Sequence, residues 1–198
     1  MARLTEAPDV TVEPVTSDRF ADLAALFEEG GDPRWCWCMY FRVRGLDWTN
    51  SSAAGNRAGL EKLTRDGPPP GLIAYRDGRA VGWVSLAPRE AYDRLERAKL
   101  LARVDARPVW SIVCFVVARR ARRAGVASAL LEAAVEYARG RGAVTLEAYP
   151  VDTGGERISA GSAYHGTLAM FERAGFEVVA GRQWNRASRV RPIVRREL

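Results

Sequence analysis

The residues whose types and spacing most clearly suggest chemistry lie between Arg119 and Ala127, where four arginines occupy the first five positions. An apolar stretch precedes this segment and residues of helical period follow it, so the segment predicts the start of a helix. Backbone N–H groups at a helix N-terminus lack partners and carry partial positive charge, which suits them to bind anions. Gly125 and Ala127 have little or no side chain, so a ligand can approach the backbone closely. The segment therefore predicts a site for a phosphate or pyrophosphate.

This loop contains neither the G-x-x-x-x-G-K-S/T pattern of a P-loop nor the Rossmann G-x-G-x-x-G pattern. Its Arg122, Gly125 and Ala127 instead resemble the R/Q-x-x-G-x-G/A pyrophosphate loop of the GCN5-related N-acetyltransferases. Residues 170–176 resemble that family's helix ending L-Y-x-x-x-G-F, and the resemblance covers roughly 10–198. Within the family, the Trp-Cys-x-Cys segment and residues 147–152 resemble a bacterial branch for which the resemblance names no substrate.

The resemblance implies an acetyl-CoA-dependent enzyme that transfers an acetyl group to a primary amine by direct attack in a ternary complex. Main-chain groups of Phe115 and Val117 would pair with the thioester carbonyl and the pantetheine arm, on a strand that a bulge splays from its neighbour. A backbone N–H aimed at the acetyl oxygen stabilises the negative charge that develops there. The coenzyme-binding residues that the resemblance implies are Phe115, Val116, Val117, Arg122, Arg123, Ala124, Gly125, Val126, Ala127, Ser128 and Phe171.

The expected catalytic residues are Glu147 and Tyr164. The family's usual acid is a tyrosine four positions before Gly175, but this chain has Phe171 there, and Tyr164 takes the place of a common asparagine. Tyr164 could protonate the departing thiolate, as water could, or it could be a packing residue. Glu147, within a predicted strand, could take the amine proton or face solvent or an arginine. Glu90 is a second candidate base, whereas His165 is expected to be structural or exposed.

The segment 34–41 is rich in aromatic residues and has two interpretations. It could be a hydrophobic plug at one end of the core or an aromatic wall of a substrate pocket, since such pockets are mostly apolar. The second interpretation favours an apolar or ring-bearing acceptor, such as a drug-like molecule or an antibiotic amine. The expected substrate-binding residues are Trp35, Trp37, Tyr40, Trp83 and Tyr149.

Apolar periodicity predicts the elements that must position these residues. An Asp-Gly pair at 77–78 predicts a hairpin turn, and 111–117 is apolar on both faces, as in a central strand. The chain is expected to be a single domain, 1–198, with a mixed α/β sheet of about six or seven strands, a splayed central parallel pair and flanking helices. Strands are expected over 10–15, 72–75, 80–86, 111–117, 144–149, 176–179 and 192–195, and helices over 18–29, 51–66, 126–140 and 166–174, with 88–104 partly helical.

The composition excludes several classes of protein. The 198 residues are 47% hydrophobic and 27% charged, which argues against a disordered or fibrous chain. No apolar run is long enough to span a membrane, and no secretory signal is expected. Cys36 and Cys38 form a lone C-x-C pair, and the sequence has no second cysteine pair or histidine cluster to complete a four-ligand zinc site, so no metal is expected. A cytoplasmic location fits best.

The net charge of +6 permits a polyanionic partner, and three functional hypotheses remain open. The first is N-acetylation of a small-molecule amine. The second is an acyl-CoA-binding or regulatory module without turnover, or one that contacts nucleic acid. The densest arginines lie where the coenzyme phosphates would bind, which disfavours nucleic acid. The third is a protein or peptide N-acetyltransferase. The sequence permits a homodimer but does not require one.

Overall fold

The computed structural model describes residues 10–31, 33–156, 158–159, 163–183 and 190–198. A seven-stranded sheet runs through the described residues in the order β1-β2-β3-β4-β5-β7-β6. Only β4 and β5 pair in parallel, and the other neighbours are antiparallel. The predicted mixed α/β sheet with one parallel pair is therefore confirmed. The strands are β1 (Thr11–Pro14), β2 (Gly71–Arg76), β3 (Arg79–Pro88), β4 (Trp110–Val117), β5 (Thr145–Ala148), β6 (Glu177–Arg182) and β7 (Arg191–Glu197).

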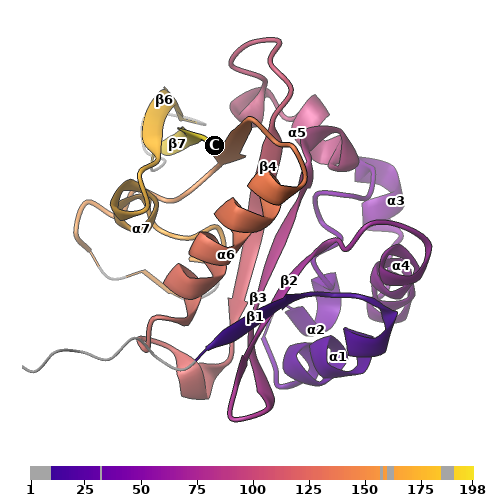
Figure 1. Cartoon of the computed structure of the whole chain (residues 1–198). Helices are drawn as coiled ribbons and strands as arrows, with labels where there is room; N and C mark the ends of the chain where they lie inside the picture. The colour runs from indigo at the N-terminus through magenta and orange to yellow at the C-terminus, as the bar shows by residue number, and fades with distance from the viewer. Residues whose placement is uncertain (1–9, 32, 157, 160–162, 184–189) are drawn as a thin grey trace, which may run out of the picture.

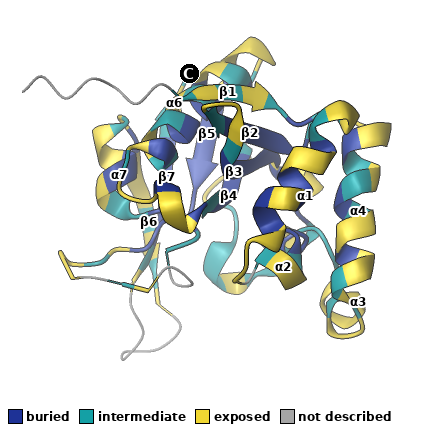
Figure 2. Cartoon of the chain, turned by 90° about the horizontal axis from the view of Figure 1, so that it is seen from below, coloured by how far each residue is buried: buried dark blue, intermediate teal, exposed yellow. Residues whose placement is uncertain are grey.

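Helices cover both faces of the sheet, as Figure 1 shows, with α6 and α7 on one side and α1, α2 and α4 on the other. The α-helices are α1 (Phe20–Glu28), α2 (Pro33–Cys36), α3 (Gly45–Thr49), α4 (Ala53–Asp66), α5 (Asp93–Arg97), α6 (Val126–Gly140) and α7 (Leu168–Arg173). Short 3-10 turns are η1 (Ser17–Arg19), η2 (Arg89–Ala91), η3 (Lys99–Leu101) and η4 (Arg119–Ala121). The central strands between the two helical layers are buried, and the outer helix faces are exposed (Figure 2).

The hairpin of β2 and β3 packs against the start of α6. Its turn residues Asp77 and Gly78 have φ values of 51° and 70°, the left-handed conformation that the Asp-Gly pair predicts. On β3, Gly82 faces α6, and a Cβ there would lie 2.7 Å from Val126 and 2.9 Å from Leu130. The missing side chain therefore lets the start of α6 approach the sheet closely.

The parallel pair β4 and β5 stays paired only near its beginning. Pairing is recorded from Trp110 to Ile112 on β4, which face Leu146 to Ala148 on β5. On the other side of β4, the register with β3 shifts so that Val113 is an extra residue, which is a β-bulge. Beyond Val113 the edge of β4 that faces β5 is free of strand pairing. This is the splay that the resemblance implied.

Candidate functional site

The loop between β4 and α6 has the geometry of an anion site. Arg123 and Gly125 both adopt left-handed conformations, with φ values of 64° and 77°. Alternation of this kind turns successive backbone N–H groups toward one concave face. The N–H of Ala129 donates to the Gly125 carbonyl, and no acceptor is recorded within the described chain for the N–H groups of Val126, Ala127 and Ser128. These are the orphan donors of a 15-residue helix.

The side chains around this loop leave it electropositive. Arg76 donates to the Ala124 carbonyl (3.1 Å), which anchors the loop, and Arg122 donates to the Val117 carbonyl (3.2 Å). Arg120 is paired with Glu29, and the side chains of Arg122 and Arg123 are exposed. The first turn of α6 contains no acidic residue. The residues present therefore fit a diphosphate. The loop offers amides with no recorded acceptor in the described chain, two residues in the left-handed conformation, and the exposed guanidinium groups of Arg122 and Arg123.

The free edge of β4 meets residues 163–166, which we call the clasp. The N–H of Phe115 donates to the carbonyl of Tyr164 (2.6 Å), and Nδ1 of His165 donates to the carbonyl of Val113 (2.9 Å). The predicted thioester-binding N–H of Phe115 is therefore engaged by the chain itself. The sequence did not indicate this contact. For the N–H of Val117, the predicted pantetheine partner, no acceptor is recorded among the described residues.

Two further predicted coenzyme residues lie beside this edge. Val116 pairs with Trp83 of β3 and is half-buried. Phe171 is fully buried in α7, where its ring contacts Phe115 at 6.1 Å between ring centroids. Phe171 thus packs against Phe115 of β4 and has no exposed surface, and its contact with the coenzyme stays a prediction.

Glu147 lies in a buried ionic network. Its two oxygens accept from Arg89 Nη1 and Arg195 Nε, each at 2.8 Å, and Tyr149 OH also donates to it at 2.6 Å. Arg89 is 0% exposed and donates further to the carbonyls of Leu95 and Leu101. The network fastens residues 89–101 to the sheet. Of the interpretations given above, this geometry favours pairing with arginine, because both oxygens of the buried Glu147 already accept from arginine. Glu90 is paired with Arg103 near the surface.

Tyr164 and His165 lie beside the bulge with their rings 3.9 Å apart. Burial raises the pKa of Tyr164 to about 12, against the opposing effect of Arg191, so its hydroxyl keeps its proton at neutral pH. Burial, with a smaller effect of Arg191, lowers the pKa of His165 to about 3. The imidazole is therefore neutral, with its proton on Nδ1. The expectation that His165 is structural agrees with this burial, but the sequence gave no sign that it holds the bulge.

A continuous series of aromatic rings leads from the surface to this point. Trp35 and Tyr40 are 46% and 37% exposed, and both contact Trp48 edge-on. Tyr40 contacts Phe41, and Phe41 contacts His165. We call this series the aromatic strip; its members are Trp35, Trp48, Tyr40, Phe41, His165 and Tyr164.

The other predicted substrate residues are buried, so the expectation of an open pocket wall is corrected for them. Trp37 is 3% exposed and packs on Phe20 and Phe27, and Trp83 is 0% exposed. Tyr149 is 1% exposed and belongs to the Glu147 network. Residues 37–39 and 41 of the aromatic segment thus form a buried plug, whereas Trp35 and Tyr40 remain exposed.

Cys38 and Cys114 lie close together in the core. Cys38 Sγ is 3.1 Å from Cys114 Sγ and accepts from Trp83 Nε1 at 3.2 Å. The hydrogen bond with Cys114 and burial raise the pKa of the Cys38 thiol. Across the described ranges, no group of three or more His, Cys, Asp or Glu side chains could hold a metal ion. Over the same ranges, no helix is both long and apolar enough for a bilayer.

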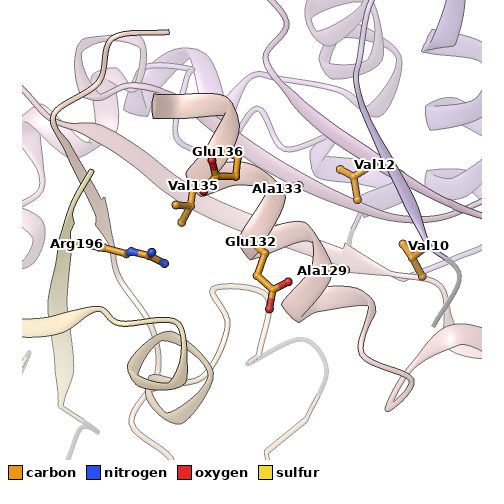
Figure 3. A pocket seen from close by; sticks show the side chains of 8 residues that line it. All are labelled: Val10, Val12, Ala129, Glu132, Ala133, Val135, Glu136 and Arg196. Atoms are coloured by element: carbon orange, nitrogen blue, oxygen red, sulfur yellow. The ribbon is translucent and has the colours of Figure 1, made fainter. Parts of the chain in front are cut away.

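An open hollow lies on the outer side of α6 (Figure 3). Val10 and Val12 lie on one side of the helix, and Arg196 lies on the other. Glu132 and Glu136 project from α6 into the region. The hollow contains none of the predicted site residues, and its two carboxylates do not suit an anionic ligand.

The lowered pKa of His165 predicts a pH-dependent stability. Its unfolded-state pKa is near 6.5, so below that pH the unfolded chain binds a proton that the native protein does not. Stability from this residue is therefore full above pH 6.5 and should fall by about 2 kcal/mol between pH 6.5 and pH 5. The measurement is the free energy of unfolding in urea at pH 6.5 and at pH 5. His165→Asn should not show the fall of about 2 kcal/mol that comes from His165. An equal loss in the variant would contradict the prediction.

Comparisons with known proteins agree with the fold. The sequence model described as "Acetyltransferase (GNAT) family" matches residues 33–176. No curated protein matches the chain significantly. An acetyltransferase of the GNAT family from Streptococcus pneumoniae has a TM-score of 0.56 and 16% identity, over 96% of this chain and 99% of that one.

Two other solved structures are similar to the same degree. A polyamine N-acetyltransferase from Drosophila melanogaster has a TM-score of 0.58 and 12% identity, over 96% of this chain and 100% of that one. A ribosomal-protein-alanine N-acetyltransferase from Brucella melitensis has a TM-score of 0.55 and 22% identity, over 95% and 99%. At such identities these likenesses show the fold alone.

The family match is stronger evidence, because it covers well over half of the chain and includes the anion loop, the bulged strand and the hairpin. The chain belongs to the GNAT acetyltransferase family, and it is an N-acetyltransferase that takes its acetyl group from acetyl-CoA.

Proposed function

We propose that this enzyme acetylates a small primary amine that bears an aromatic or apolar ring. The observation that carries the proposal is the aromatic strip, which joins exposed Trp35 and Tyr40 to buried rings beside Phe115. Binding sites for small molecules are mostly apolar, with a few polar groups that fix orientation. An acceptor lying along the strip would hold its amine near the bulge.

Charge near the strip supports an acceptor with little positive charge. The guanidinium of Arg94 lies 4.0 Å from the ring centre of Tyr40, and Arg191 lowers the pKa of Tyr164 by its charge. A polyamine would meet these cations as like charges. The largest electrostatic effects on Tyr164 come from Arg191, two thiols and Tyr40. A weakly basic amine needs no strong base, because it arrives neutral.

Residues of the loop and of β4 would hold the donor. Arg122 and the amides of residues 123–128 would bind the diphosphate, and main-chain groups of Phe115 and Val117 would bind the thioester end and the arm. Acetyl-CoA supplies an activated acyl carbon. The neutral amine nitrogen forms a bond to that carbon and gives up one proton to solvent water, the carbon–sulfur bond breaks, and the departing thiolate takes one proton.

Tyr164 is the proposed donor of that proton. Tyr164→Phe should lower kcat about tenfold or more and change KM little, because only the hydroxyl is removed. Since the pKa of Tyr164 is about 12, the activity of the wild-type enzyme should not fall through pH 7–9 by loss of this proton. Unchanged kcat in the variant would leave water as the acid.

The acceptor class is tested with an amine library and detection of released thiol. Ring-bearing small amines should be turned over best, and Trp35→Ala should raise KM for them about tenfold with kcat nearly unchanged. Leu46→Ala, at a residue that is 82% exposed outside the strip, is the matched control. Turnover of peptide N-termini in preference to small amines would replace this proposal with a peptide N-acetyltransferase. Binding of acetyl-CoA without turnover of any amine would indicate a regulatory module.

A further inference from the structure

The clasp joins the two separated strands at the place where the proposed thioester end would bind. On one side, Tyr164 and His165 bond to Phe115 and Val113 of β4. On the other side, the N–H of Val151 donates to the carbonyl of Gly166 (3.0 Å), and Val151 forms a parallel bridge with Thr167. Residues 163–166 therefore lie between β4 and the chain that follows β5.

The clasp occupies only part of the free edge of β4. It uses the carbonyl of Val113 and the N–H of Phe115. Farther along the edge, the N–H of Val117 has no recorded partner within the described residues. The pantetheine arm could pair at Val117 while the clasp is closed. A thioester oxygen could reach Phe115 only by replacing the carbonyl of Tyr164.

We propose that the clasp is an internal competitor that distinguishes acetyl-CoA from CoA, with His165 as the residue that sets its strength. This inference rests on the proposed function, because it takes Phe115 as the donor to the thioester oxygen. Acetyl-CoA offers a carbonyl that replaces that of Tyr164, and the clasp opens. CoA has no carbonyl there, so the clasp stays closed when CoA is bound, and the strength of the clasp leaves the affinity for CoA unchanged.

The hydrogen bond of His165 can be separated from the packing of its ring by substitution. Its Nδ1–H holds the carbonyl of Val113, and its ring packs between Phe41 and Tyr164. Asparagine can keep the donor without the ring, because its side-chain amide nitrogen takes the place of Nδ1. Phenylalanine can keep the ring without the donor. The two variants therefore test the hydrogen bond apart from the packing.

The binding test is calorimetric titration with acetyl-CoA and with CoA, without any amine. The loss of one typical hydrogen bond changes an affinity by a factor between about three and ten. His165→Phe should bind acetyl-CoA tighter by about that factor and bind CoA within twofold of the wild-type protein. His165→Asn should keep the wild-type ratio of the two affinities. An unchanged ratio in a folded His165→Phe variant would overturn the inference and leave the proposed function intact.

A second measurement needs no variant, because the chain contains a single histidine. The NMR signal of the Nδ1 proton should persist in the free protein and with CoA, and it should be lost or strongly shifted with acetyl-CoA. Persistence with bound acetyl-CoA, or the same change with both ligands, would overturn the inference. Failure of the wild-type protein to bind acetyl-CoA would overturn the proposed function itself, and the inference with it.

Discussion

Ser128→Glu is expected to weaken acetyl-CoA binding by about 100-fold or more, while the protein stays folded. Ser128 is exposed in the first turn of α6, where the N–H groups of Val126 and Ala127 have no recorded acceptor in the described chain. A carboxylate there repels the diphosphate and can accept from the same amides. Because negative charge stabilises a helix N-terminus, the variant should melt at or slightly above the wild-type temperature.

Ser128→Gln is the matched control for this substitution. It has the length of glutamate without the charge, so it should lose much less affinity, within about tenfold. Calorimetric titration of both variants with acetyl-CoA gives the comparison. If Ser128→Glu is folded and binds as tightly as Ser128→Gln, the diphosphate does not lie at the start of α6.

Glu147→Gln is expected to destabilise the protein by about 3 kcal/mol, because it removes the buried carboxylate that two buried arginines share and leaves them only the part-exposed carboxylates of Glu96 and Asp105. Arg89 is 0% exposed and Arg195 is 7% exposed, so water cannot replace the lost carboxylate. The measurement is the free energy of unfolding in urea. Glu90→Gln breaks a pair whose carboxylate is 59% exposed, and it should cost no more than about 1 kcal/mol.

The same variant separates two roles of Glu147. A structural role predicts a large loss of stability and, well below the melting temperature, a kcat within severalfold of wild type. A role as general base predicts a kcat that collapses while the free energy of unfolding barely changes. The second result would restore Glu147 to the catalytic residues that the sequence suggested.

Local signals were sufficient to predict most of the fold. The Asp77–Gly78 turn, the doubly apolar β4 and the helical period of α6 are each encoded within a few neighbouring residues. The predicted and observed bounds of these elements therefore differ by two residues or fewer. The short helices α2 and α3 were not predicted, because helices of four or five residues carry no readable period.

Only the part of the candidate site that is formed by backbone groups could be predicted from the sequence. Gly125 indicates a loop that a ligand can approach, and a helix N-terminus binds anions whatever its side chains. By contrast, the two arginine partners of Glu147 lie 58 residues before it and 48 after it in the chain, so no spacing rule could reveal them. The hydrogen bond from Phe115 to Tyr164 was equally hidden, because every residue has a backbone carbonyl.

The orientation of the aromatic residues also depends on the tertiary structure. Trp35 and Trp37 have the same side chain two positions apart, yet one is 46% exposed and the other 3%. The left-handed backbone at Trp37 and Cys38 breaks the alternation that a strand would give. Composition indicated an aromatic wall, but only the fold selects which rings form it.

The central claim is that the amides at the start of α6 hold the diphosphate of the acetyl donor. The most direct test is a crystal structure of the protein grown with acetyl-CoA. We expect the diphosphate oxygens within hydrogen-bonding distance of the N–H groups of Val126, Ala127 and Ser128. Density for the coenzyme in the hollow outside α6, or anywhere that leaves those three amides without a ligand, would contradict the claim.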